Sequence, residues 1–158
     1  MNSLRNDTRS RIEVAFAETP YPGDQNITPH ECSECAAIRN ALKGTDWHDW
    51  IEAPVAELRR HAVLPLFSPE ALRYFLPAFL IAVIREPGPA QWILEQFLYA
   101  LNPQEEDRRR STKAFLKILN KAQIDALTAF VDWTATELPE YVSVEDIAGA
   151  KTTLRRVL

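Results

Sequence analysis

The chain has 158 residues and a mass of 18.0 kDa, which is the size of one domain with a single hydrophobic core. Its 46% hydrophobic and 25% charged residues exclude a disordered chain, a coiled-coil rod and a collagen-like repeat. The four glycines are few for the tight turns of an all-β sandwich, and the net charge of −4 argues against a nucleic-acid partner.

Apolar residues recur at intervals of three and four along most of the chain, as on the buried face of a helix. No segment longer than four residues alternates apolar and polar side chains in the manner of a strand. We therefore expect residues 1–158 to form one all-α domain, a compact bundle of seven or eight helices. The predicted helices are 6–18, 29–43, 54–62, 69–85, 89–101, 103–119, 121–137 and 143–156.

Short polar motifs predict where several of these helices begin. Thr28-Pro29-His30-Glu31 has the residue types of a capping box, with proline at the first helical position. Ser68-Pro69-Glu70 and Asn102-Pro103-Gln104-Glu105 repeat this pattern, and Ser143 is a further cap without the proline. Gly44 is the residue type that ends a helix in the left-handed conformation.

The segment from Ser68 to Arg85 is apolar on nearly every side, which predicts a central buried helix. Pro77 lies inside it and removes one backbone hydrogen bond, so we expect a kink or break there. The most apolar run, from Tyr74 to Ile84, is too short to cross a hydrocarbon layer about 30 Å thick. The first residues lack the pattern of a secretory signal, and we expect a cytoplasmic protein with reduced thiols. The predicted core residues of this helix are Tyr74, Phe75, Leu76, Phe79 and Leu80.

His30, Cys32 and Cys35 form an H-x-C-x-x-C spacing. Thiolates and imidazoles are zinc ligands, and on a helix the two cysteines lie about 60° apart, close enough to converge on one ion. His30 would lie about 140° from Cys35 and joins them only if the first turn unwinds. We favour a structural interpretation in which Cys35 packs with Ile38 and Leu42, and keep a metal or redox role as the alternative.

Two polar segments are candidates for contact with a partner. Pro20-Tyr21-Pro22-Gly23-Asp24 is a rigid loop, and Thr45 to Trp50 holds Asp46 and Asp49 beside two tryptophans and a histidine. The alternative is a turn that seats Tyr21 on the core while Asp24 caps the chain, with the tryptophans in the core. His48 with Asp46 or Asp49 is a weak candidate for acid–base chemistry. The predicted partner-binding residues are Tyr21, Asp24, Asp46 and Asp49.

Three stretches resemble an uncharacterised bacterial domain-of-unknown-function family of small, mostly helical proteins. They are Ile12 to Asp24, His30 to Trp47 and Leu66 to Leu80. Their landmarks are a YPGD loop, a C-x-x-C helix start and a Y-F-L-P-A segment. The resemblance implies a bacterial origin and a compact helical fold, and it carries over no activity and no catalytic residues.

The sequence holds no phosphate-binding glycine loop, nucleophile elbow or metalloprotease motif, and we expect the protein not to be an enzyme. Our first hypothesis is a protein-binding module without cofactor, of the kind an immunity-type inhibitor represents, whose acidic surface meets a basic toxin. The alternative is a zinc-binding or thiol redox-sensing domain built on His30, Cys32 and Cys35. Neither hypothesis involves nucleic acid or a membrane.

Overall fold

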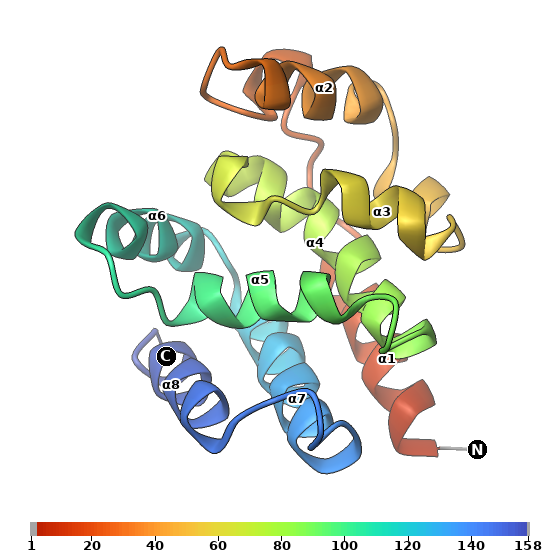
Figure 1. Cartoon of the computed structure of the whole chain (residues 1–158), viewed down its shortest axis with the longest axis vertical. Helices are drawn as coiled ribbons and strands as arrows, with labels where there is room; N and C mark the ends of the chain where they lie inside the picture. The colour runs from red at the N-terminus through yellow and green to blue at the C-terminus, as the bar shows by residue number, and fades with distance from the viewer. Residues whose placement is uncertain (1–2, 158) are drawn as a thin grey trace.

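The computed structural model describes residues 3–157, and all regular structure in that range is helical. Eight α-helices and three short 3-10 helices account for it, without a strand, so the predicted all-α class is confirmed (Figure 1). The α-helices are α1 (Ser3–Phe16), α2 (Ser33–Leu42), α3 (Val55–His61), α4 (Pro69–Arg85), α5 (Gln91–Leu101), α6 (Glu106–Lys117), α7 (Lys121–Glu137) and α8 (Val144–Arg155). The 3-10 helices are η1 (Asp24–Asn26), η2 (Trp47–Trp50) and η3 (Leu64–Leu66).

Helix α4 is the centre of the fold. It contacts α1, α3, α5, α6 and η2, and every residue from Tyr74 to Ile84 is buried, which includes the five predicted core residues. Pro77 lies inside one continuous helix, so the predicted break does not occur, although the carbonyl of Arg73 loses the N–H that residue 77 would otherwise donate. No helix within residues 3–157 combines the length and apolar character that crossing a bilayer requires.

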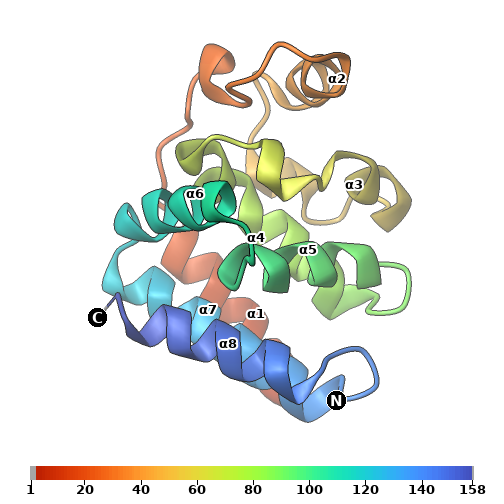
Figure 2. The ribbon, with the colours of Figure 1, turned by 60° about the vertical axis from the view of Figure 1, so that its left-hand side comes forward.

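The other helices lie on either side of α4 along the long axis of the molecule. Helix α7 packs between α1 and α8, and α5 contacts α8, so these elements gather toward one end (Figure 2). Helix α2 lies at the opposite end (Figure 1). Apolar spacing of three and four residues predicts a buried stripe of Ile124, Leu127, Val131, Thr134 and Leu138, and all five are buried.

Two of the predicted helix starts and the predicted helix end are confirmed. The side chain of Ser68 accepts the backbone N–H of Ala71 at 3.0 Å, and Ser143 accepts that of Asp146 at 3.0 Å. Each hydroxyl satisfies one of the N–H groups that the first turn leaves free. Gly44 follows α2 with φ +71°, a left-handed conformation that glycine adopts without strain.

The predicted start at Thr28 is wrong, because α2 begins only at Ser33. Thr28 is buried, and its hydroxyl accepts a hydrogen bond from Nη1 of Arg39 at 2.8 Å. The Thr28 hydroxyl is therefore bound to Arg39, in the last turn of α2, and does not cap a helix at Glu31.

The predicted start at Asn102 is wrong for a different reason. The N–H of Asn102 bonds to the carbonyl of Tyr99 and ends α5, so the residues up to Glu105 form the turn into α6.

In α5 the apolar spacing predicts a buried stripe of Trp92, Leu94, Phe97, Leu98 and Leu101. Four of these are buried, but Trp92 is 43% exposed and its neighbour Ile93 is buried in its place.

Candidate functional site

The C-x-x-C motif lies at the beginning of α2. Cys32 has extended backbone and is the N-cap residue, and its sulfur accepts the backbone N–H of Cys35 at 3.3 Å. Cys32 is exposed, whereas Cys35 is fully buried on the same helix face as Ile38 and Leu42. The predicted burial of Cys35 is confirmed, and Cys32 at the cap is exposed to solvent.

The two cysteine sulfurs lie 2.9 Å apart, and both thiols are free. Hydrogen bonds from the Cys35 thiol and then from the Cys35 backbone N–H lower the pKa of Cys32 below its ordinary value, because they stabilise its thiolate. Burial raises the pKa of Cys35. Since the thiolate is the nucleophilic form, the exposed sulfur is the one prepared to react and the buried sulfur is held next to it.

Arg39 fixes the chain that leads into Cys32. Its Nη1 lies 2.8 Å from the Thr28 hydroxyl and 2.8 Å from the carbonyl oxygen of His30, and its Nη2 lies 3.4 Å from the Glu31 carboxylate. The Thr28 hydroxyl in turn donates to the carbonyl of Cys35 at 3.4 Å. The segment 28–31 is thus held against α2, and sequence reasoning missed Arg39 because its partners are eight to eleven positions away.

His30 lies in this non-helical segment, outside the helix on which the sequence placed it. Among residues 3–157, no group of three or more His, Cys, Asp or Glu side chains is placed to share a metal ion. The geometry gives the zinc alternative on His30, Cys32 and Cys35 no support.

Tyr21 and Asp24 come together at the turn that follows α2. The Tyr21 hydroxyl donates to the Asp24 carboxylate, and the backbone N–H of Gly44 lies 2.7 Å from the Tyr21 oxygen and 3.2 Å from Asp24 Oδ1. The Tyr21 ring meets the Tyr74 ring edge-on, with centroids 5.4 Å apart. Gly23, at φ +95°, gives the loop the left-handed backbone that lets it turn there.

Asp46 and Asp49 lie two and five residues beyond Gly44 and form a capping box at η2. Asp46 Oδ1 accepts the backbone N–H of His48 at 2.8 Å, and Asp49 Oδ2 accepts that of Asp46 at 3.4 Å. The backbone N–H of His48 lowers the pKa of Asp46. His48 Nδ1 also lies 2.6 Å from Asp46 Oδ1, and its ring stacks on buried Trp47. The spacing of the two aspartates was the signal for this cap, and sequence reasoning did not use it.

The chain is similar to one known protein family. The model of a family of unknown function, DUF6714, matches residues 5–152. No curated protein and no solved structure matches the chain.

Proposed function

The chain belongs to DUF6714, a family of unknown function, and we propose from its geometry that it is a thiol redox-sensing domain. In this proposal Cys32 and Cys35 interconvert between a dithiol and a disulfide. The observation that carries it is the placement of an exposed thiol 2.9 Å from a buried one. A disulfide has an S–S bond of about 2.05 Å, so a shift of less than about 1 Å brings the sulfurs to bonding distance.

The reaction is a pair of thiol–disulfide exchanges. The Cys32 thiolate attacks one sulfur of a disulfide R–S–S–R, forms a mixed disulfide and releases R–S⁻, which takes up the proton that Cys32 lost. Cys35 then gives up its proton and attacks the Cys32 sulfur, which releases the second R–SH. The protein loses two electrons and two protons, and R–S–S–R becomes two thiols.

The domain acts as a stoichiometric sensor rather than an enzyme, and it works in the cytoplasm of a bacterial cell, where thiols are kept reduced. The structural change that reports oxidation takes place at the beginning of α2. The Cys32 sulfur caps the Cys35 N–H, and the chain before it is tied to Arg39. Drawing that sulfur into a disulfide therefore changes the cap and the position of segment 28–31.

The proposal is tested by treating the reduced protein with excess bis(2-hydroxyethyl) disulfide and mapping the product by mass spectrometry. We expect one intramolecular bond between Cys32 and Cys35, a loss of about 2 Da, and full reversal by reduced dithiothreitol. Cys32→Ser and Cys35→Ser are the matched controls, because neither can form that bond. Two results would contradict the proposal. The first is oxidation of the wild type that gives intermolecular dimers and no intramolecular bond. The second is stoichiometric zinc on both cysteines in protein purified without added metal.

A second candidate function is contact with a basic protein surface, such as the toxin that an immunity-type inhibitor neutralises. It is favoured by the gathering of Asp24, Asp46 and Asp49, all exposed, around the turn at Gly44, with Tyr21 36% exposed beside them. Charge complementarity of this kind speeds association with a cationic partner.

The triple variant Asp24→Asn, Asp46→Asn, Asp49→Asn tests the second candidate. It removes three charges and keeps a side-chain oxygen at each cap, so the melting temperature should stay within a few degrees of wild type. Cross-linking mass spectrometry in a lysate of the host should map a partner to this face in the wild type and lose it in the variant. Cross-links that lie elsewhere, or that persist in the variant, would contradict it.

A further inference from the structure

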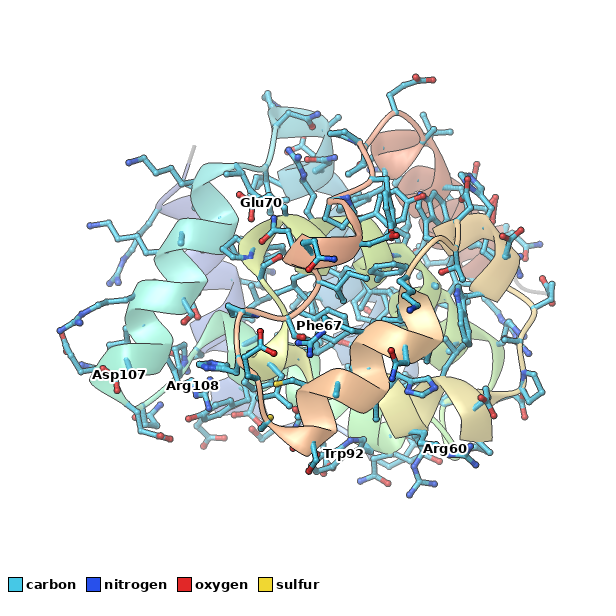
Figure 3. All side chains as sticks on the ribbon, turned by 90° about the horizontal axis from the view of Figure 1, so that it is seen from above. Arg60, Phe67, Glu70, Trp92, Asp107 and Arg108 are labelled. Atoms are coloured by element: carbon cyan, nitrogen blue, oxygen red, sulfur yellow. The ribbon has the colours of Figure 1, made fainter. Side chains whose placement is uncertain are left out.

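A groove of about 320 Å³ lies beside the chain that leads into Cys32. It is bordered by segment 29–30, by the residues around the start of α4, and by α6. Its apolar lining includes Phe67 and Phe115, both nearly buried. In Figure 3, Arg108 extends from α6 toward the end of α2 at which that helix begins. A volume of this size is that of a small-molecule site rather than of a protein interface.

The groove is close to the reactive thiol. His30 lines it and precedes Cys32 by two residues, so their Cα atoms are no more than about 7 Å apart. The carbonyl of His30 is fixed by Arg39 at 2.8 Å, which keeps that border of the groove in place. Cys32 is not itself part of the lining, and it follows the border that His30 forms by two residues.

The charged side chains that line the groove are cationic, although the chain as a whole carries a net charge of −4. Arg108 donates to the carbonyl of Pro65 at 3.2 Å, which fixes its side chain in the lining. Arg110 is exposed and, within residues 3–157, forms neither an ion pair nor a hydrogen bond. It is a free guanidinium at a surface that contributes no carboxylate of its own.

Several acids lie near this region. On α6 itself, Glu106 pairs with Arg109 at 3.7 Å, and Asp107 lies one turn before Arg110. The Tyr99 hydroxyl donates to Glu105, and Glu31 pairs with Arg39 at 3.4 Å. Glu34, in the first turn of α2, opposes an anion at Cys32. The attraction for an anionic ligand must therefore come from the groove and not from the start of the helix.

We infer that the groove binds a low-molecular-weight disulfide that carries carboxylate groups, and that it presents a sulfur of that ligand to Cys32. This inference rests on the proposed function and names the oxidant class R–S–S–R. A guanidinium binds a carboxylate through two parallel hydrogen bonds, so Arg110 both attracts the ligand and orients it. The apolar lining holds the methylene groups next to the ligand's sulfurs. After Cys32 attacks, one half of the ligand stays bound as the mixed disulfide, the other leaves as a thiol, and Cys35 displaces the bound half.

Three disulfides of different charge test the inference. The rate of Cys32–Cys35 bond formation is measured with glutathione disulfide, which is anionic, with bis(2-hydroxyethyl) disulfide, which is neutral, and with cystamine, which is cationic. The variant is Arg110→Glu, and its matched control is Lys113→Glu. The control makes the same charge change on α6 at an exposed residue outside this groove.

We expect Arg110→Glu to slow the reaction with glutathione disulfide by about tenfold, to speed that with cystamine, and to leave the neutral reagent within about twofold. Lys113→Glu should leave all three rates within about twofold. Equal effects of the two variants would overturn the inference while leaving the redox function intact. Failure of the neutral reagent to oxidise the wild type would instead overturn the proposed function. Arg110→Gln, which introduces no new charge, should give an intermediate effect and guards against misfolding of Arg110→Glu.

Discussion

Nη1 of Arg39 lies 2.8 Å from the carbonyl oxygen of His30, although nine positions separate the two residues. The guanidinium comes from the last turn of α2 and holds the chain that enters its first turn. The position of the exposed Cys32 thiol therefore depends on a residue two helical turns away.

Replacing Arg39 with alanine should release segment 28–31. We expect faster amide hydrogen exchange there and a loss of about 1–3 kcal/mol of unfolding free energy, because two neutral acceptors lose a charged donor. Arg59→Ala is the matched control, since Arg59 is exposed and forms no side-chain bond or ion pair within residues 3–157. Unchanged exchange in segment 28–31 of Arg39→Ala would show that the segment is held by other contacts.

The two cysteines should respond differently to replacement by serine. Cys32→Ser should leave the unfolding free energy within about 0.5 kcal/mol or raise it slightly, because serine is a preferred N-cap residue. Cys35→Ser should cost about 1–3 kcal/mol, because it places a hydroxyl at a fully buried position. Urea unfolding followed by circular dichroism measures both, and equal losses in the two variants would contradict the contrast in burial.

The reactivity of Cys32 should depend on pH through a lowered pKa. We expect its rate of alkylation by iodoacetamide to rise with an inflection below pH 9.0, while Cys35 stays slow. In Cys35→Ala the inflection should move up, since the hydrogen bond from the Cys35 thiol is the largest cause of the shift. An inflection that does not move would assign the effect to the backbone N–H alone.

His61 should make stability fall in acid. Burial lowers its pKa below the ordinary 6.5, with Glu57 opposing the shift, and Nε2 has no hydrogen-bond partner. The unfolded state binds the proton more tightly than the folded state, so the stability that neutral His61 allows is present above about pH 6.5 and is lost as the pH falls below it. Urea midpoints between pH 7.5 and 5 should drop more steeply in the wild type than in His61→Leu. Parallel curves would show that His61 has the same pKa in both states.

The sequence predicted a helix start correctly where the capping side chain bonds to a backbone N–H in the same turn. Ser68 and Ser143 cap the helices that follow them because their oxygens meet an N–H three residues on. Thr28 has the same residue type, but its hydroxyl bonds to Arg39, and no local pattern encodes that long-range partner. Asn102 failed as a cap because it ends the preceding helix.

The candidate thiol site was partly visible in the sequence. The burial of Cys35 follows from its helical spacing with Ile38 and Leu42, and that prediction is confirmed. The exposure of Cys32 depends on the start of α2 at Ser33. The sequence pattern predicts that start four residues earlier, at Pro29. The arginines of the groove, Arg108 and Arg110, lie on α6, more than seventy residues after Cys32, so only the fold brings them near it.

The measurement that tests the redox account most directly is the equilibrium of Cys32 and Cys35 with a series of reduced and oxidised glutathione mixtures. Acid quenching, alkylation and mass spectrometry give the fraction of Cys32–Cys35 disulfide at each ratio. The account predicts the same fraction whether the protein starts reduced or oxidised, with a midpoint between about −180 and −300 mV and the fold retained throughout. A pair that remains reduced at every ratio, or that oxidises only between molecules, would contradict it.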